Sequence, residues 1–283
     1  MKLVEKRRLS IDSRINEYYS NFKGPYKNEI KIKHLLTHSS GIKGYVEYFK
    51  MDSISNEGDI LDDILNREIS FKPGTKFEYS DLGFILLKNI IEKTNRSQFD
   101  KLASRWIYRP LKMNNTYFNP SSNIKIVPTE YDSIYRGRMI QGEVHDENAF
   151  MIGGVSGHAG LFSNAWDVAI FTKLFLNDGV WLGKRHFGKS TVRKFTKKQN
   201  MPKGSDRTFG WDTPSQTGSS AGDFFSNQSF GHLGFTGTSV WVDKKNEIII
   251  VFLTNRVHPS RHKEGIYKVR RKFHNEAMKE LLN

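Results

Sequence analysis

The stretch FKPGTKFEYSDLGFILLKNIIEKT, residues 71–94, carries the clearest local signal in the chain. A Pro-Gly turn leads through a short extended piece to Asp81, and apolar residues then recur at helical spacing through Leu82, Ile85 and Ile90. The pattern predicts an apolar helix directly behind Tyr79. This phenol can shuttle a proton if a neighbouring cation lowers its pKa from the usual value of about 10. A half-buried tyrosine beside an aspartate that caps the helix explains the same residues.

Outward from this stretch, apolar periodicity predicts further helices within 30–38, 58–67, 98–108 and 163–179. In the last of these, Ser163 is expected to cap the start of the helix and Gly179 lies just beyond its end. Residues 112–160 are rich in Gly, Asn and Pro, which is typical of long loops that cover or form a site. Near the C-terminus, FGHLG, TSVWVD and EIIIVFLTN predict three strands with connections so short that neighbouring strands must be antiparallel.

A final helix is predicted over 264–281. Its apolar positions are expected to pack onto the sheet, and they are Ile266, Val269, Phe273, Ala277 and Leu281. Together these elements predict an α+β fold in one domain spanning 1–283. It consists of an antiparallel sheet flanked by helices, with a helical lobe in the middle of the sequence.

Composition excludes several classes of function. The chain has no cysteine, so it has no disulfide, thiol nucleophile or Cys-ligated zinc. Its longest apolar run, IIIVFL, is far shorter than the roughly 20 residues of a transmembrane helix, and the basic start lacks the apolar region of a signal peptide. The net charge of +14 lies on segments that look like amphipathic surface helices without a nucleic-acid module. We therefore expect a solvated basic face, or attraction to an anionic cell envelope, and no nucleic-acid partner.

The histidines offer two further hypotheses. His34 and His38 are four residues apart, but the catalytic zinc motif is His-Glu-x-x-His and Leu35 follows His34, so no metal is expected. A metal site that also uses His145, His158 and His232 is the alternative. His232, in GHLGFTGT, lies at a predicted strand end among glycines. That arrangement indicates either a binding site with close backbone approach or a tight turn.

These stretches together resemble the penicillin-recognising serine hydrolases, which include class C β-lactamases, DD-peptidases and related esterases. IKHLLTHSSGI is similar to that family's histidine-rich loop, Tyr79-Ser80-Asp81 to its Tyr-x-Asn motif, and His232-Leu233-Gly234 to its Lys-Thr-Gly or His-Thr-Gly motif. RGRMIQGEVHDENAFMIGGVSGHAGLFS and LTNRVHP resemble a subgroup also found fused behind family 3 glycoside hydrolases. The resemblance implies the three-layer α/β/α β-lactamase/transpeptidase-like fold.

The family's central motif, Ser-x-x-Lys, supplies its nucleophile. Four windows fit this pattern, at Ser20/Lys23, Ser40/Lys43, Ser122/Lys125 and Ser260/Lys263, but none begins a predicted apolar helix. The opening MKLVEKRRLS resembles the segment that follows the nucleophile helix in relatives, and no capping residue precedes it. We therefore expect a domain truncated at its N-terminus, without the motif and the first strands. The strand at 247–254 would then have an unpaired edge that pairs with another chain and lowers stability.

The resemblance also implies roles for the residues present. Tyr79 would be the proton shuttle, and Asp81, in place of the usual Asn, cannot donate a hydrogen bond when ionised. The backbone N–H of Phe235, after Gly234, matches one donor of the oxyanion hole. His232 and Leu233 weaken recognition of a substrate carboxylate, which favours an esterase or peptidase over a β-lactamase.

The resemblance thus implies a serine hydrolase of esters, amides or cell-wall peptides that uses neither a metal nor a cofactor. As this chain it is expected to be inactive, because it lacks the nucleophile Ser and Lys. The alternative is a non-catalytic module that binds cell-wall fragments. By family analogy the location is the periplasm or cell envelope.

Overall fold

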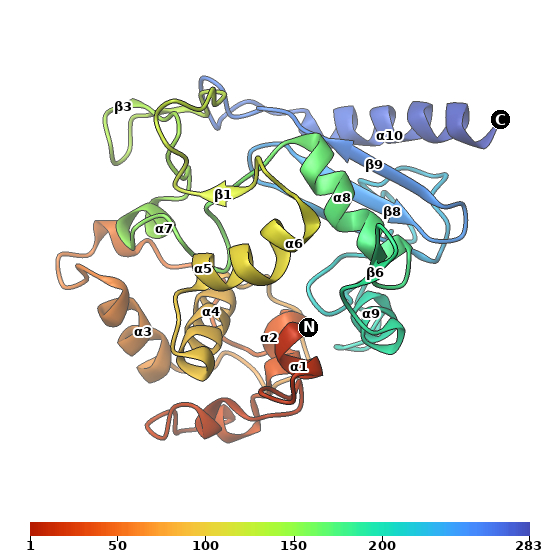
Figure 1. Ribbon diagram of the computed structural model, residues 1–283. Helices are drawn as coiled ribbons and strands as arrows, with labels where there is room; N and C mark the ends of the chain where they lie inside the picture. Colours follow the sequence, from red (N-terminus) through yellow and green to blue (C-terminus); the bar gives the residue numbers. More distant parts are fainter.

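A three-stranded antiparallel sheet with helices on both faces lies near the C-terminus in the computed structural model, which describes residues 1–283 (Figure 1). The strands are β7 (Ser229–Leu233), β8 (Ser239–Asp243) and β9 (Ile248–Phe252), in the order β7-β8-β9. All three predicted strands and their antiparallel pairing are confirmed.

Successive residues of β8 face opposite sides of the sheet, as strand geometry requires. Val242 packs with Phe175 of α8 (Ala165–Leu176), whereas Trp241 packs with Met278 of α10 (Ile266–Leu282). Helices therefore cover both faces, and the predicted α/β/α layering around an antiparallel sheet is confirmed.

The predicted packing face of α10 is wrong. Val269 and Leu281, expected to face the sheet, are 51% and 58% exposed, while the buried residues are Arg270, His274 and Met278. These three positions recur every four residues and form one helical face. Apolar periodicity missed this face because two of its three members are polar.

The polar members of this face are buried because their hydrogen bonds are satisfied. His274 bonds through Nε2 to the Ser239 hydroxyl at 3.2 Å and through Nδ1 to the Ser220 carbonyl at 2.9 Å. On the flank of the helix, the Phe273 ring stacks on Phe252 with centroids 4.1 Å apart.

β9 is an edge strand, because it pairs with β8 alone. This agrees with the expectation that residues 247–254 offer an unpaired strand edge. Pairing of that edge with another chain stays a prediction.

The helical lobe lies beside the sheet and is coloured red to yellow in Figure 1. Its helices are α2 (Ile32–Leu36), α3 (Glu57–Asn66), α4 (Asp81–Asn95), α5 (Phe99–Ala103) and α6 (Arg109–Leu111). Ser80 is the N-cap of α4, since its hydroxyl accepts the Gly83 N–H at 3.0 Å, so the interpretation of Asp81 as the capping residue is wrong.

The helical chain after α5 runs past Pro110, where the sequence predicted its end. A π-helical turn, Ser104–Tyr108, precedes α6. Since this turn already interrupts the regular hydrogen-bond ladder, the missing N–H of proline is tolerated there.

The predicted loop at 112–160 contains only short elements. Figure 1 shows this segment in yellow to green beside the helical lobe. The elements within it are β1 (Tyr117–Phe118), β2 (Tyr131–Asp132), β3 (Arg138–Met139) and α7 (Glu147–Met151). The remaining elements of the chain are α1 (Lys2–Glu5), β4 (Leu161–Phe162), β5 (Val180–Trp181), β6 (Lys184–Arg185), α9 (Lys189–Thr196) and 3-10 turns at Ile15–Glu17, Lys27–Glu29 and Tyr48–Lys50. Asn164, rather than the neighbouring Ser163, caps α8 by accepting the Asp167 N–H at 2.8 Å.

An apolar cavity of about 410 Å³ lies between α1, the α4–α6 helices and α8. Side chains that line it include Leu3, Leu87, Trp106 and Phe171. Met1 also lines it, and burial lowers the pKa of the Met1 amino group to about 6.

Candidate active site

Tyr79 lies at the mouth of α4, between the helical lobe and the sheet. Its ring stacks on His38 at 4.2 Å between centroids, and the Arg207 guanidinium lies 5.4 Å from the ring centre. The ring centroid of His232, on β7, is 6.4 Å away. The structure therefore brings together two predicted site residues that are far apart in the sequence.

The segment after α2 fixes the backbone around Tyr79. The Glu78 N–H donates to the His38 carbonyl, and the Ser80 N–H donates to His38 Nδ1, both at 2.9 Å. The Ser80 hydroxyl donates to the Lys43 carbonyl at 2.9 Å. The resulting anchors lie on both sides of Tyr79, so the histidine-rich loop positions the phenol.

His34 and His38 do not share one helix, although the sequence placed them on one. His38 lies beyond the end of α2, and its Nδ1 is occupied by Ser80. His34 Nδ1 accepts the Lys31 N–H at 3.1 Å. Burial lowers the pKa of His34 to about 4 and that of His38 to about 3, so both imidazoles are neutral at neutral pH.

The Tyr79 phenol is protonated at neutral pH. Partial burial, with the charge of Asp81 adding to it, raises its pKa to about 12. The Arg207 charge acts in the opposite direction but is outweighed. The proton-shuttle interpretation required a lowered pKa, whereas these residues alone raise it, so in this environment Tyr79 is a hydrogen-bond donor.

Asp81 belongs to a cluster that the sequence did not reveal. Ligand atoms of Asp81, Asp146 and His158 all lie within 4.8 Å of one another, so these residues are the ones that could hold a metal ion. Both ring nitrogens of His158 are already engaged, Nε2 with Asp146 at 3.0 Å and Nδ1 with the Ser156 hydroxyl at 2.9 Å. The signal available in the sequence was HDENA and GHAG, two short motifs in the long loop.

The members of this cluster shift one another's pKa values. Burial raises the pKa of Asp81 to about 6, with Asp146 raising it further and His158 lowering it. Although burial opposes it, the hydrogen bond to Asp146 raises the pKa of His158 above its usual value. With a pKa of about 6, Asp81 is mostly ionised at pH 7.

His232 is a neutral residue of β7. Its Nδ1 lies 2.8 Å from the Leu233 carbonyl, to which it donates, and burial lowers its pKa. Next to it, the Arg207 guanidinium pairs with the Asp212 carboxylate. The Asp212 backbone bonds in turn to Gly231 at 2.8 and 2.9 Å, which attaches this ion pair to β7. Sequence reasoning did not single out Arg207 or Asp212.

Gly234 and Phe235 form the turn between β7 and β8. The Phe235 side chain is exposed and its ring stacks on His145 at 5.6 Å. The backbone N–H of Phe235 has no hydrogen-bond acceptor in the protein. It is therefore available to a bound molecule.

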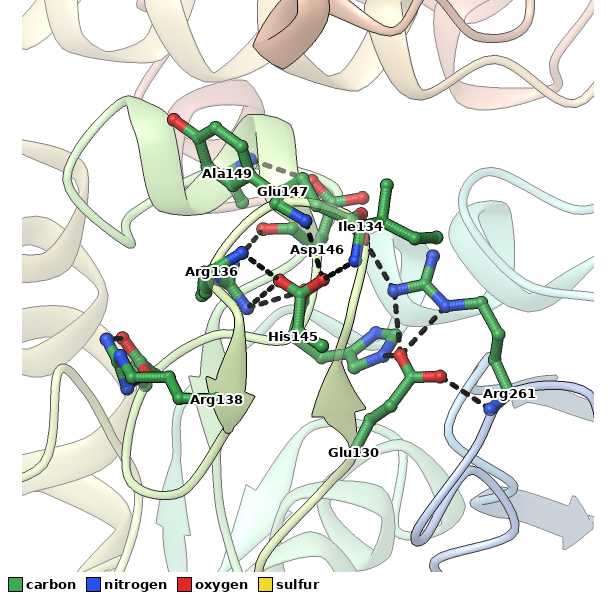
Figure 2. A network of polar contacts seen from close by, with 12 residues as sticks. Glu130, Ile134, Arg136, Arg138, His145, Asp146, Glu147, Ala149 and Arg261 are labelled. Atoms are coloured by element: carbon green, nitrogen blue, oxygen red, sulfur yellow. Dashed lines mark hydrogen bonds and ion pairs between the residues drawn. The ribbon is translucent and has the colours of Figure 1, made fainter.

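A buried ionic network ties the long loop to the segment after β9 (Figure 2). Glu130 accepts hydrogen bonds from His145 Nε2 at 2.6 Å and from Arg261 Nε at 2.8 Å. Arg261 Nη2 also donates to Glu147 at 2.5 Å. Because His145 stacks on Phe235 and Asp146 follows it, the network supports two parts of the candidate site at once.

The four Ser-x-x-Lys windows lie outside every helix and strand of the structure. The groups that the site does offer are the neutral phenol of Tyr79, the neutral imidazole of His232 and the free N–H of Phe235. They suit hydrogen bonding to a polar acyl compound. None of the helices is long and apolar enough to span a membrane.

Comparison with known proteins gives a consistent result. A family model described as "Beta-lactamase" matches residues 1–272. The protein named "Putative D-alanyl-D-alanine carboxypeptidase" of Escherichia coli (strain K12) is 34% identical over 289 residues, which cover 91% of this chain and 65% of that protein. The "N-acetylmuramyl-L-alanine amidase" of Bacillus subtilis (strain 168) is 31% identical, with coverages of 91% and 64%.

The chain thus spans somewhat less than two thirds of the length of these curated relatives. Among solved structures, the octameric penicillin-binding protein homologue from Pyrococcus abyssi matches with a TM-score of 0.70 at 22% identity, over 100% of this chain and 62% of that one. This likeness shows the fold alone.

Proposed function

The chain belongs to the beta-lactamase family, and from that premise we propose that its cleft serves acyl transfer to and from a serine, on esters, amides or cell-wall peptides. The observation that supports this most is the approach of Tyr79 to His232, with 6.4 Å between ring centroids. His232 lies on β7, and the turn after this strand carries the unpartnered N–H of Phe235. The phenol of Tyr79 thus approaches the imidazole of His232, and the unpartnered N–H of Phe235 lies three residues after that imidazole in the sequence.

In this proposal the reaction of the family has two steps, and it requires a serine and a lysine that none of the four windows in these 283 residues is placed to supply. A serine oxygen bonds to the substrate's carbonyl carbon, and the serine proton passes through Tyr79 to the departing alcohol or amine. Water then attacks the acyl-serine ester, which releases the acid and restores the serine. The Phe235 N–H stabilises the negative oxygen of both tetrahedral intermediates.

Tyr79 needs a nearby cation for the proton-accepting half of this cycle, because a phenol with a pKa of about 12 is a weak base catalyst at neutral pH. The lysine of a Ser-x-x-Lys motif would supply that charge. Asp81, with its pKa of about 6, would hold such an ammonium group when ionised.

The proposed substrates are peptides or amides from the cell wall, since the relatives named above are a carboxypeptidase and an amidase. The neutral His232 and the apolar Leu233 disfavour strong recognition of a substrate carboxylate. The proposed location is accordingly the cell envelope.

We further propose that these 283 residues bind such compounds without becoming acylated, because none of their four Ser-x-x-Lys windows lies in a helix or strand. A dedicated binding module for cell-wall fragments is the second candidate function. It predicts binding in the same cleft but no covalent chemistry under any condition.

The test is an NMR titration of the ¹⁵N-labelled chain with diacetyl-L-lysyl-D-alanyl-D-alanine, with the all-L isomer as the matched ligand. The expected shifts cluster at Tyr79, His232 and Phe235, and Tyr79→Phe weakens binding. Tyr131→Phe, at an exposed tyrosine on β2, is the control variant and leaves binding unchanged. Absence of shifts in the cleft, or equal binding of the all-L peptide, contradicts the proposal.

A further inference from the structure

Arg270 is a buried arginine with no carboxylate partner. It lies on the inner face of α10, where it is 7% exposed. Burial, together with the charge of Arg256, lowers its pKa from the usual arginine value. A buried charge without a counter-ion costs free energy unless hydrogen bonds replace its water shell, so its acceptors indicate its role.

All of its acceptors belong to the turn between β7 and β8. Arg270 Nη2 donates to the carbonyls of Gly234 at 2.6 Å and Thr238 at 2.7 Å, and Nε donates to the carbonyl of Gly237 at 3.1 Å. Only the planar fork of a guanidinium can serve three carbonyls in this way, and a lysine ammonium cannot match that geometry.

The bond to Gly234 determines where the next N–H points. The Gly234 carbonyl and the Phe235 N–H belong to one peptide unit, which is trans, so the two groups point in opposite directions. Since Arg270 holds the oxygen on the side of α10, the Phe235 N–H points away from α10. That N–H has no acceptor in the protein.

A second arginine holds the next peptide unit. Arg256 Nε donates to the Phe235 carbonyl at 2.9 Å, and its guanidinium lies 4.5 Å from the centre of the Phe235 ring. Two further bonds, to the carbonyls of Arg261 at 2.8 Å and Lys263 at 3.2 Å, fix Arg256 itself. The carbonyls of Gly234 and Phe235 thus each accept a hydrogen bond from an arginine, Arg270 and Arg256 respectively.

We propose that Arg270, assisted by Arg256, is a positioning residue that orients the Gly234–Phe235 peptide and strengthens its N–H as a donor toward a substrate oxygen. A cation on the carbonyl polarises the amide, which makes the N–H at the other end more acidic. The role for substrate rests on the proposed function, whereas the orientation of the peptide does not.

The test compares Arg270→Met and Arg270→Lys with Arg271→Met, a matched variant of the neighbouring arginine. Arg271 bonds outside the turn, to Asp223 and to the Ser219 carbonyl. Amide hydrogen exchange at Gly234 and Gly237 reads the closure of the turn, because their N–H groups donate to Thr238 and Gly234 at 2.8 and 3.0 Å. The amide proton shift of Phe235 reads the polarisation.

In Arg270→Met the two amides are expected to exchange about tenfold faster or more, since hydrogen bonds from a charged donor are lost. The Phe235 amide proton is expected to move upfield in the same variant, with Arg270→Lys intermediate and Arg271→Met like the parent. Unchanged exchange and shift at these positions in Arg270→Met, or equal effects in Arg271→Met, overturn the proposal. If Arg270→Met does not fold, Arg270→Lys decides by the same two readings.

A third arm separates this inference from the proposed function. The titration with diacetyl-L-lysyl-D-alanyl-D-alanine is repeated on Arg270→Lys, and weaker binding with intact exchange elsewhere is expected. If the parent chain does not bind the peptide, the proposed function is contradicted, and the exchange and shift readings still judge the orientation. If binding is equal in parent and variant although the Phe235 shift moves, the role toward substrate is refuted.

Discussion

Replacing Arg261 by methionine should destabilise the protein strongly, because it removes the cation shared by two buried carboxylates. Glu130 and Glu147 are each 3% exposed, and the Arg261 guanidinium donates to both (Figure 2). Breaking a buried ion pair by removing one partner costs about 3–5 kcal/mol. His145 still donates to Glu130 in the variant, which favours the lower end of that range.

The loss should depend on pH in a defined direction. Although burial opposes it, hydrogen bonds from Arg261 and His145 hold the pKa of Glu130 below its usual value. An acid with a lowered pKa stabilises the fold above the pKa of the unfolded chain, about 4.3 for Glu, and this contribution is lost as the pH falls through the folded value. In Arg261→Met the buried Glu130 carboxylate loses a cation and takes up a proton more readily, so the stability difference from the parent should narrow as the pH falls from 7 to 4.

Urea unfolding followed by tryptophan fluorescence at pH 7 and pH 4 measures both effects. Arg138→Met is the control, because Arg138 pairs with Glu143 at the surface with its side chain 55% exposed, and such pairs contribute about 0–1 kcal/mol. If Arg261→Met costs no more than Arg138→Met at pH 7, or if its deficit is as large at pH 4, the account of the network is refuted.

Three further outcomes follow from the same contacts. Met278→Ala on the buried face of α10 should cost about 2–5 kcal/mol in urea unfolding, whereas Leu281→Ala on the exposed face should cost less than about 0.5 kcal/mol; equal costs would restore the packing face expected from periodicity. His158→Gln should raise the pKa of Asp81 above its value of about 6, measured by carboxyl ¹³C NMR, because the positive charge of His158 lowers it; an unchanged or lower value argues against the cluster. Leu253→Lys, just beyond β9, should reduce concentration-dependent self-association in light scattering, because charge at a strand edge disfavours pairing; a parent chain that is monomeric at every concentration contradicts strand pairing.

Much of the framework was accessible from local pattern. The apolar spacing after Asp81 identified α4, and the short connections between the last three strands required antiparallel pairing. Tyr79, His232 and Phe235 were singled out by motif, and the structure brings the first two within 6.4 Å.

The supporting contacts were not accessible, because they join residues far apart in the sequence. Arg270 was part of a run that looked like a solvated basic face, yet its partners are carbonyls 32 to 36 residues earlier. Glu130 and Arg261 are 131 residues apart and carry no local signal of pairing. Periodicity counts apolar side chains, so it cannot recognise buried polar residues whose partners appear only in the folded chain.

The central proposal is that these residues form the cleft of a serine hydrolase while none of the four Ser-x-x-Lys serines is placed to be acylated. Intact-mass spectrometry of the purified chain after incubation with a fluorophosphonate tests this most directly, with an active serine hydrolase treated in parallel. No covalent adduct is expected at these four serines. A stoichiometric adduct at Ser20, Ser40, Ser122 or Ser260 would contradict it.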